Sequence, residues 1–179
     1  MLEMLILGRG GQGAQTAGKL LAEAFFAEGH QVQTFATYGG ARRGTPVSAS
    51  LRVDDRPIRL RCNIERASAM LCFDSSLLDA NFLAAADSET RIVVNSAQSE
   101  EAFAGLGDYR IVPVDGAAIA RRNNMGKVVN SALLGAFAAV LEQPEIDTMC
   151  QIVESSAPVK HQENVAACRE AYQHLKKLA

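Results

Sequence analysis

The chain has 179 residues, which suits a single domain over 1–179, and 48% of them are hydrophobic, enough for a sizeable core. A formal net charge of −2 gives no support for a surface that binds nucleic acid or an anionic membrane. Each apolar run is shorter than the roughly 20 residues of a membrane-spanning helix, and Met1-Leu2-Glu3 leads directly into an apolar run rather than into a signal-like segment. We therefore expect a cytoplasmic protein with no nucleic-acid or membrane partner.

The first apolar run, residues 4–7, leads into a glycine-rich turn, Gly8-Arg9-Gly10-Gly11-Gln12-Gly13. Apolar residues then recur at helical spacing from Ala14 to Glu28, and Gly29 follows where a helix would stop. A strand, a glycine turn and a helix in this order favour a bound phosphate, because the turn N–H groups and the helix dipole both attract it. We expect a β-carbon at Gly11 or Gly13 to obstruct this ligand more than the fold. The alternative is a tight turn that serves packing and binds nothing.

Gly8, Gly10 and Gly13 have the G-x-G-x-x-G spacing of dinucleotide-binding folds. In those folds an acidic residue about 20 positions further on holds the ribose hydroxyls of NAD. Here the second apolar run, residues 32–36, leads into Thr37 and Tyr38 with no acidic residue nearby. The sequence therefore disfavours NAD and favours another phosphate-bearing ligand.

A second polar, glycine-rich loop runs from residue 37 to residue 46 and contains Tyr38, Arg42, Arg43 and Gly44. Two arginines beside a tyrosine can present planar guanidinium groups to a phosphate or a carboxylate. Because the loop follows the second strand at its carboxyl end, we expect it beside the glycine turn, in the crevice where open α/β sheets bind ligands. An equally open alternative is that Arg42 and Arg43 bind carboxylates of a partner subunit.

From Val47 to Val53 apolar and polar residues alternate strictly, which predicts a half-buried strand, and residues 56–60 should pair back with it as a hairpin. Regular alternation of strands and helices then resumes. The expected strands are 69–73, 91–95 and 109–114, and the expected helices are 74–86, 116–123, 130–141, 145–154 and 160–178. The pattern predicts an α/β fold with three layers: a Rossmann-like, mostly parallel sheet with a β-hairpin excursion and a helical C-terminal end.

Few other residues indicate chemistry. Asn130 follows a polar turn and could cap the helix that begins there, while Lys127 in the same turn could instead reach a phosphate. The cysteines are widely spaced without a C-x-x-C pair, which favours buried free thiols over a metal or iron–sulfur site: Cys62, Cys72, Cys150 and Cys168. We assign no catalytic residue and no metal ligand to the chain.

Taken in order, these motifs resemble the gamma subunit of pyruvate and related 2-oxoacid:ferredoxin oxidoreductases. The resemblance rests on G-x-G-G-Q-G at residues 8–13, Y-G-x-x-R-R-G at residues 38–44, Leu51-Arg52-Val53 with Arg56-Pro57-Ile58, and a helix that starts at Asn130 and contains Gly135. It covers most of the chain, and the first two motifs together are quite specific.

The resemblance implies a subunit of an enzyme that oxidatively decarboxylates a 2-oxoacid to its acyl-CoA and reduces ferredoxin. It implies alpha, beta and delta-type (ferredoxin-like) subunits as partners, thiamine diphosphate and iron–sulfur clusters on those other chains, and no activity for this chain alone. It also implies that this chain helps to form the coenzyme A region. The expected contact residues, inferred from their loop positions, are Gly8, Arg9, Gly10, Gly11, Gln12, Gly13, Tyr38, Arg42, Arg43 and Gly44.

Two alternatives stay open on sequence alone. An independent oxidoreductase could bind NADP, with Arg42 or Arg43 at the 2′-phosphate. A purely structural assembly subunit would use the glycine turn for packing. The motifs also leave the identity of the 2-oxoacid open, because its recognition is expected on the thiamine-binding subunits.

Overall fold

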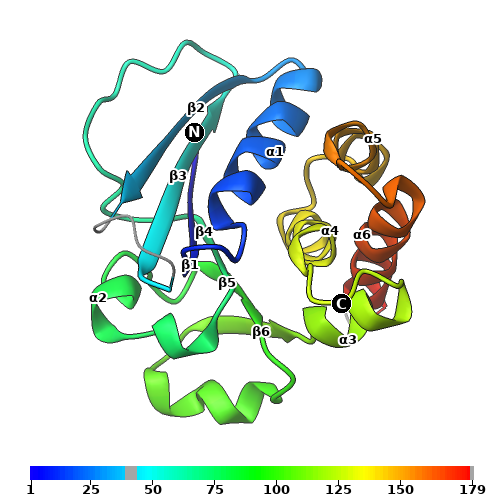
Figure 1. Ribbon diagram of the computed structural model, residues 1–179. Helices are drawn as coiled ribbons and strands as arrows, with labels where there is room; N and C mark the ends of the chain where they lie inside the picture. The colour runs from blue at the N-terminus through cyan, green and yellow to red at the C-terminus, as the bar shows by residue number, and fades with distance from the viewer. Residues whose placement is uncertain (39–43, 178–179) are drawn as a thin grey trace.

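The computed structural model describes residues 1–38 and 44–177. Six strands form one sheet in the order β2-β3-β1-β4-β5-β6 (Figure 1). They are β1 (Leu2–Arg9), β2 (Gln31–Tyr38), β3 (Pro46–Asp54), β4 (Ala69–Cys72), β5 (Arg91–Asn95) and β6 (Arg110–Val114). β1, β4, β5 and β6 pair in parallel, whereas β3 pairs antiparallel with both β1 and β2. The mostly parallel α/β sheet is confirmed, with β3 reversed.

Helices lie on both faces of this sheet. On one face α1 (Ala14–Ala27) and α4 (Asn130–Leu141) pack next to the strands, and α5 (Ile146–Ser156) and α6 (His161–Lys176) pack outside them (Figure 1). α3 (Gly116–Arg122) joins β6 to this helical side. The opposite face carries shorter pieces: α2 (Ala80–Leu83) and the 3₁₀ segments η1 (Ser75–Leu77) and η2 (Glu100–Leu106). The helical C-terminal end is thus confirmed.

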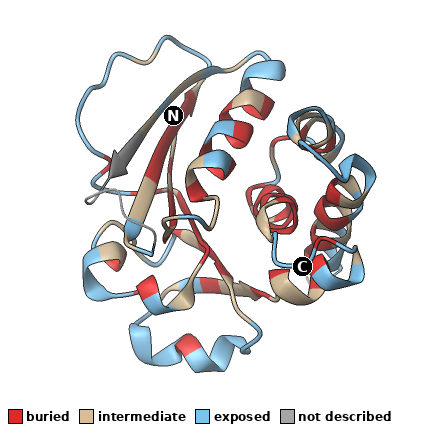
Figure 2. Ribbon diagram, viewed as in Figure 1, coloured by how far each residue is buried: buried red, intermediate tan, exposed pale blue. Residues whose placement is uncertain are grey.

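The sheet separates two apolar cores. In β4, Ala69 and Leu71 belong to the core under the long helices, while Met70 and Cys72 belong to the core under the shorter pieces, as the two-residue period of a strand requires. Buried residues follow the sheet and the facing sides of the helices (Figure 2). α4 is buried on almost every side because it lies between the sheet and α6. A β-carbon on Gly135 would lie 1.9 Å from the carbonyl oxygen of Cys168, so α4 and α6 pack backbone against backbone there.

The hairpin expected between residues 47–53 and 56–60 is wrong. β3 already has a neighbour on each side, so the sheet leaves no edge beside it for residues 56–60, which form no strand. The chain after β3 is instead held at residues 60 and 62: Gln33 Nε2 donates to the carbonyl oxygen of Leu60 at 2.9 Å, and Arg52, which is 1% exposed, binds Cys62. The Arg52 guanidinium donates to Glu3 Oε1 at 2.7 Å and to the carbonyl oxygen of Cys62 at 3.0 Å. The antiparallel excursion exists, but it consists of β2 and β3.

Most other expected elements agree with the structure to within two residues at each end. The helix expected over residues 74–86 is broken into η1 and α2, because Asp74 and Asp79 each accept a hydrogen bond from a backbone N–H further on and so start separate short helices. Cys62 is exposed, contrary to expectation, while the other three cysteines are buried. Within residues 1–38 and 44–177, no helix combines the length and the apolar character needed to cross a bilayer.

Candidate ligand site at the carboxyl edge of the sheet

Segments that are far apart in the sequence meet at the carboxyl edge of the parallel strands. The glycine turn follows β1, Asp74 follows β4, and Asn95 ends β5. Because β3 runs in reverse, its first residues lie at this same edge, beside the end of β1. α4 also begins here, since Nδ2 of Asn130 donates to the carbonyl oxygen of Gly13 at 3.0 Å. The crevice in which open α/β sheets bind ligands lies at this edge.

The glycine turn and the end of the second loop are joined through their backbones. The N–H of Gly10 donates to the carbonyl oxygen of Thr45 at 2.9 Å, and the N–H of Gly44 donates to that of Gly10 at 3.1 Å. These bonds extend the β1–β3 pairing beyond Arg9 and Pro46. The expectation that this loop ends beside the turn is therefore confirmed at Gly44. Tyr38 lies at the end of β2, and Arg42 and Arg43 lie outside the described residues.

Several N–H groups of the turn are already used within the protein. The N–H of Arg9 donates to Gln12 Oε1 at 2.7 Å, and the N–H of Gln12 donates to the carbonyl oxygen of Arg9 at 2.9 Å. With the Gly10 N–H bonded to Thr45, the donors best suited to an anion are those of the first turn of α1, which helix geometry leaves without an internal acceptor. α1 is described along its whole length, and it has neither a side-chain cap at Gly13 nor an acidic residue in its first turn.

Two glycines of the turn are required by the backbone itself. Gly11 has φ 94° and Gly13 has φ 95°, values that residues with a side chain rarely adopt. A β-carbon on Gly13 would also lie 2.5 Å from Nδ2 of Asn130. A β-carbon at Gly13 would therefore act on the fold through Asn130, while the expectation that it disturbs the ligand more than the fold stays a prediction. Gly8 is also confined, since its β-carbon would lie 3.0 Å from that of Ala14.

The Arg9 side chain is bound to the residues around the turn. Its Nε donates to Asp74 Oδ2 at 2.9 Å, its Nη2 to Ser76 Oγ at 2.8 Å, and its Nη1 to the carbonyl oxygen of Gly44 at 3.3 Å. Gln12 Nε2 donates to the same Asp74 oxygen at 3.2 Å. The guanidinium that the sequence offered as a phosphate contact therefore already has an acceptor at each nitrogen.

Asp74 is held as a carboxylate. Partial burial acts to raise its pKa, but the hydrogen bonds from Ser76, Arg9 and Gln12 outweigh burial and hold the pKa below its ordinary value. Its other oxygen, Oδ1, accepts from the N–H of Ser76 at 3.1 Å and from its hydroxyl at 2.6 Å. Burial raises the pKa of the neighbouring Cys72 thiol to about 12, so this cysteine stays neutral and unreactive.

Asparagines join the remaining segments of the edge. Asn130 does not cap α4 as expected: the N-cap is Val129, and Asn130 reaches across to Gly13 instead. Asn95 Nδ2 donates to the carbonyl oxygen of Phe73 at 3.2 Å, and its Oδ1 accepts from the N–H of Gly116 at 3.2 Å. Asp74 and Asn95 were not predicted from the sequence as residues of this site. Their signal was present, because each is a polar residue at the end of a buried apolar run.

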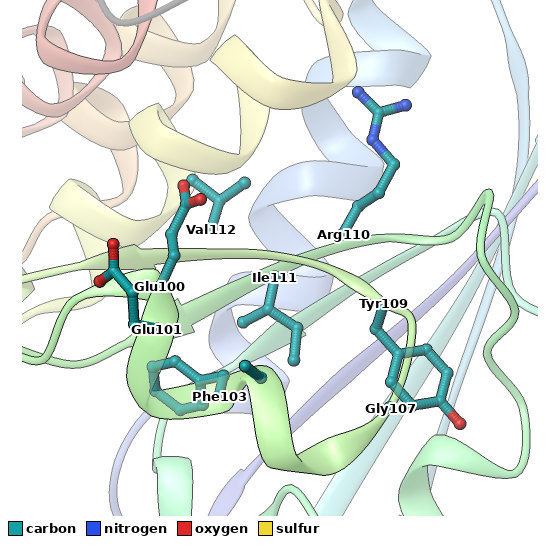
Figure 3. A pocket seen from close by; sticks show the side chains of 9 residues that line it. Glu100, Glu101, Phe103, Gly107, Tyr109, Arg110, Ile111 and Val112 are labelled. Atoms are coloured by element: carbon teal, nitrogen blue, oxygen red, sulfur yellow. The ribbon is translucent and has the colours of Figure 1, made fainter.

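A separate hollow lies beside β6, outside the predicted site. It has a volume of about 610 Å³, and its lining combines apolar Phe103 and Ile111 with charged Glu100, Glu101 and Arg110 (Figure 3). The free edge of β6 is poorly suited to strand addition. The carbonyl oxygen of Val114 faces β5, where it accepts from the N–H of Ser96. Successive residues of a strand turn their backbone groups to opposite sides, so the backbone groups of Ile111 and Pro113 face the free edge. Proline has no N–H, and the N–H of Ile111 already donates to the carbonyl oxygen of Tyr109 at 3.1 Å.

Comparison with known proteins identifies the family. A model of pyruvate ferredoxin/flavodoxin oxidoreductase matches residues 3–174. The chain is 35% identical to the pyruvate synthase subunit PorC of Methanothermobacter thermautotrophicus, over 99% of this chain and 98% of that protein. It is 36% identical to the common subunit gamma of the pyruvate/ketoisovalerate oxidoreductases of Pyrococcus furiosus, over 97% of this chain and 96% of that protein.

Solved structures agree with the sequence relatives. The crystal structure of pyruvate oxidoreductase subunit PORC from Thermotoga maritima has a TM-score of 0.84 at 27% identity, covering 96% of this chain and 95% of that chain. The 2-oxoglutarate:ferredoxin oxidoreductase of Magnetococcus marinus, solved with 2-oxoglutarate, coenzyme A and succinyl-CoA bound, has a TM-score of 0.76 at 21% identity, covering 99% of this chain and 31% of that chain; this likeness shows the fold alone. Since the relatives match nearly end to end, the motif resemblance is confirmed, and the chain belongs to the pyruvate ferredoxin/flavodoxin oxidoreductase family.

Proposed function

We propose that this chain is the gamma subunit of a multisubunit 2-oxoacid:ferredoxin oxidoreductase and that its carboxyl edge helps to bind coenzyme A. The enzyme oxidatively decarboxylates a 2-oxoacid, transfers the acyl group to coenzyme A and passes the electrons to ferredoxin. The chain supplies part of a substrate site and a surface for assembly, and it is inactive alone. Its partners are alpha, beta and delta-type (ferredoxin-like) subunits, in a complex that works in the cytoplasm.

The start of α1 carries this proposal. Its first-turn N–H groups face the carboxyl edge with no side-chain cap and no acidic residue beside them, which is the arrangement that binds phosphate groups. Coenzyme A has a pyrophosphate and a 3′-phosphate, and it does not need the acidic ribose ligand that NAD would need. Gly11, Gly13 and the first turn of α1 would hold one phosphate, while Tyr38, Arg42 and Arg43 remain proposed contacts from the adjoining loop.

The electron-transfer groups are assigned to other subunits. The described residues include no group of three or more histidine, cysteine or acidic side chains that could hold one metal ion. Cys62 lies on the surface and Cys72 in the sheet, while Cys150 on α5 and Cys168 on α6 are two neighbouring thiols, too few to hold a cluster. We therefore propose that thiamine diphosphate and the iron–sulfur clusters are held by the partner chains.

A charge placed in the first turn of α1 tests the proposal. Thr16 is exposed and is the third residue of α1, so Thr16→Glu should leave the fold unchanged or slightly stabilised, because an acidic side chain favours a helix N-terminus. In the assembled enzyme the same charge should repel a bound phosphate and raise KM for coenzyme A about tenfold. Thr16→Gln controls for size, and Gln151→Glu, on the exposed side of α5, controls for net charge.

The outcome separates coenzyme A binding from assembly alone. An unchanged KM for coenzyme A in assembled Thr16→Glu enzyme would remove the start of α1 from the site. It would leave the glycine turn with the packing role that its contact with Asn130 also favours.

A further inference from the structure

We propose that Arg9 and Asp74 are positioning residues, whose ion pair fixes the end of the second loop at Gly44 against the glycine turn and so shapes the coenzyme A site. The inference rests on the proposed function, since it assumes that this edge binds coenzyme A. It assigns a role to Asp74, and it changes that of Arg9 from a direct phosphate contact to a residue that acts through Gly44.

The contacts of Arg9 carry the inference. One guanidinium joins three separate segments: the turn that contains it, the residues after β4 through Asp74 and Ser76, and the end of the second loop, two residues before β3, through the Gly44 carbonyl. A lysine has a single nitrogen and cannot reproduce this planar set of three bonds. The Arg9 side chain is 35% exposed and that of Asp74 is 24% exposed, so the pair is partly shielded from water.

The Arg9–Asp74 pair also affects the charge of the site. A carboxylate beside a phosphate site repels the ligand, and Asp74 lies in the same network as the glycine turn through Gln12. Arg9 neutralises this carboxylate, so the N–H groups at the start of α1 are left as the attractive feature for an anion. Asp74 in turn satisfies Arg9, which keeps the guanidinium from leaving Gly44 to follow a ligand.

The two possible roles of Arg9 give opposite results when Asp74 is changed. If Arg9 were a direct phosphate ligand, Asp74 would compete with coenzyme A, and Asp74→Asn would lower KM. If Arg9 is a positioning residue, Asp74→Asn weakens the bridge to Gly44 and raises KM. We expect Asp74→Asn and Arg9→Lys each to raise KM for coenzyme A about threefold to tenfold, with kcat and KM for the 2-oxoacid retained.

The test uses the assembled enzyme and a double-mutant cycle. Because both changes break one network, Arg9→Lys with Asp74→Asn should raise KM no more than the larger single effect. Asp87→Asn is the matched control: Asp87 also pairs with an arginine, Arg66, and also accepts from a backbone N–H two residues on, but it lies before β5, at the opposite edge of the sheet. It should leave KM for coenzyme A unchanged.

A lower or unchanged KM for coenzyme A in assembled Asp74→Asn enzyme would overturn the inference. If that variant fails to assemble, Ser76→Ala removes one acceptor of Arg9 and one donor to Asp74, and it must show a smaller rise in the same direction for the inference to stand. The proposed function is tested independently by Thr16→Glu, which raises KM for coenzyme A if coenzyme A binds at the start of α1, whether or not Arg9 is a positioning residue. A raised KM in Thr16→Glu with none in Asp74→Asn or Ser76→Ala would refute only the positioning role.

Discussion

Replacing Gly13 with alanine adds a β-carbon that the Asn130 side chain must move to accommodate. The backbone has φ 95° at this residue, and the new carbon would lie 2.5 Å from Nδ2 of Asn130. The left-handed backbone costs a residue with a side chain about 1–2 kcal/mol, and the collision adds about 1–3 kcal/mol. We expect Gly13→Ala to lower the free energy of unfolding by about 3 kcal/mol in total.

Gly29→Ala separates the two contributions. Gly29 has φ 90°, but nothing in the described structure lies within 4 Å of its β-carbon position, so its alanine variant should lose only the backbone term, about 1 kcal/mol. Urea denaturation of the isolated chain measures both. The extra cost at Gly13 should shrink in the Asn130→Ala background, where the colliding atom is gone. Equal losses for Gly13→Ala and Gly29→Ala, or an extra cost that persists without the Asn130 side chain, would refute this reasoning.

Three further predictions concern the charges and thiols. The pKa of Asp74 is lowered in the folded state, so its contribution to stability is complete above its unfolded pKa of about 4 and is lost as pH falls through the folded value. The difference in urea midpoint between wild type and Asp74→Asn should therefore become smaller below about pH 4. A difference that grows there would contradict this argument. Arg52→Ala leaves the Glu3 carboxylate and the Cys62 carbonyl without their buried partner and should lower the free energy of unfolding by about 3–5 kcal/mol. Arg61 is exposed, so Arg61→Ala should lower it by under about 0.5 kcal/mol. Similar urea midpoints for the two variants would contradict the stabilising role of Arg52. With a thiol-reactive dye the native isolated chain should show one fast thiol, exposed Cys62, and three slow buried ones, and loss of the fast phase in Cys62→Ser would confirm its source.

The glycine turn, the start of α1 and the bounds of α4 could be predicted from short stretches of sequence. The turn after β1 and the start of α1 follow from a glycine-rich segment between an apolar run and a helical period. α4 was bounded correctly at Asn130 and Leu141 because its apolar run begins after a polar turn and ends before a proline. Neither conclusion required knowledge of distant residues.

The position of β3 could not be read in the same way. Its alternation shows that it is a strand, but its place between β2 and β1 depends on pairings across the sheet. The neighbouring Arg56-Pro57-Ile58 segment has strand-like residues, yet it forms no strand, because β3 is already paired on both sides. The buried Arg52 binds the chain further on, at the Cys62 carbonyl. Sequence alternation gives no sign of such a buried cation.

The sequence predicted which segments meet at the candidate site but not the side-chain contacts within it. The meeting of the glycine turn with Gly44 follows from strand order and direction, and the structure confirms it. The partners of Arg9 and Asn130 are 65 and 117 residues away in the chain, so a loop position alone made Arg9 resemble a free phosphate ligand. The structure instead shows a cation that uses three of its five N–H donors on Asp74, Ser76 and Gly44.

The central claim is that the start of α1 binds a phosphate of coenzyme A, and a structure of the assembled enzyme with coenzyme A tests it most directly. The account expects a phosphate oxygen about 3 Å from a backbone nitrogen between Gly13 and Thr16, with the Arg9–Asp74 pair intact beside it. Coenzyme A bound with every phosphate held by other subunits, and none within about 6 Å of these nitrogens, would contradict the account, because no direct hydrogen bond spans that distance.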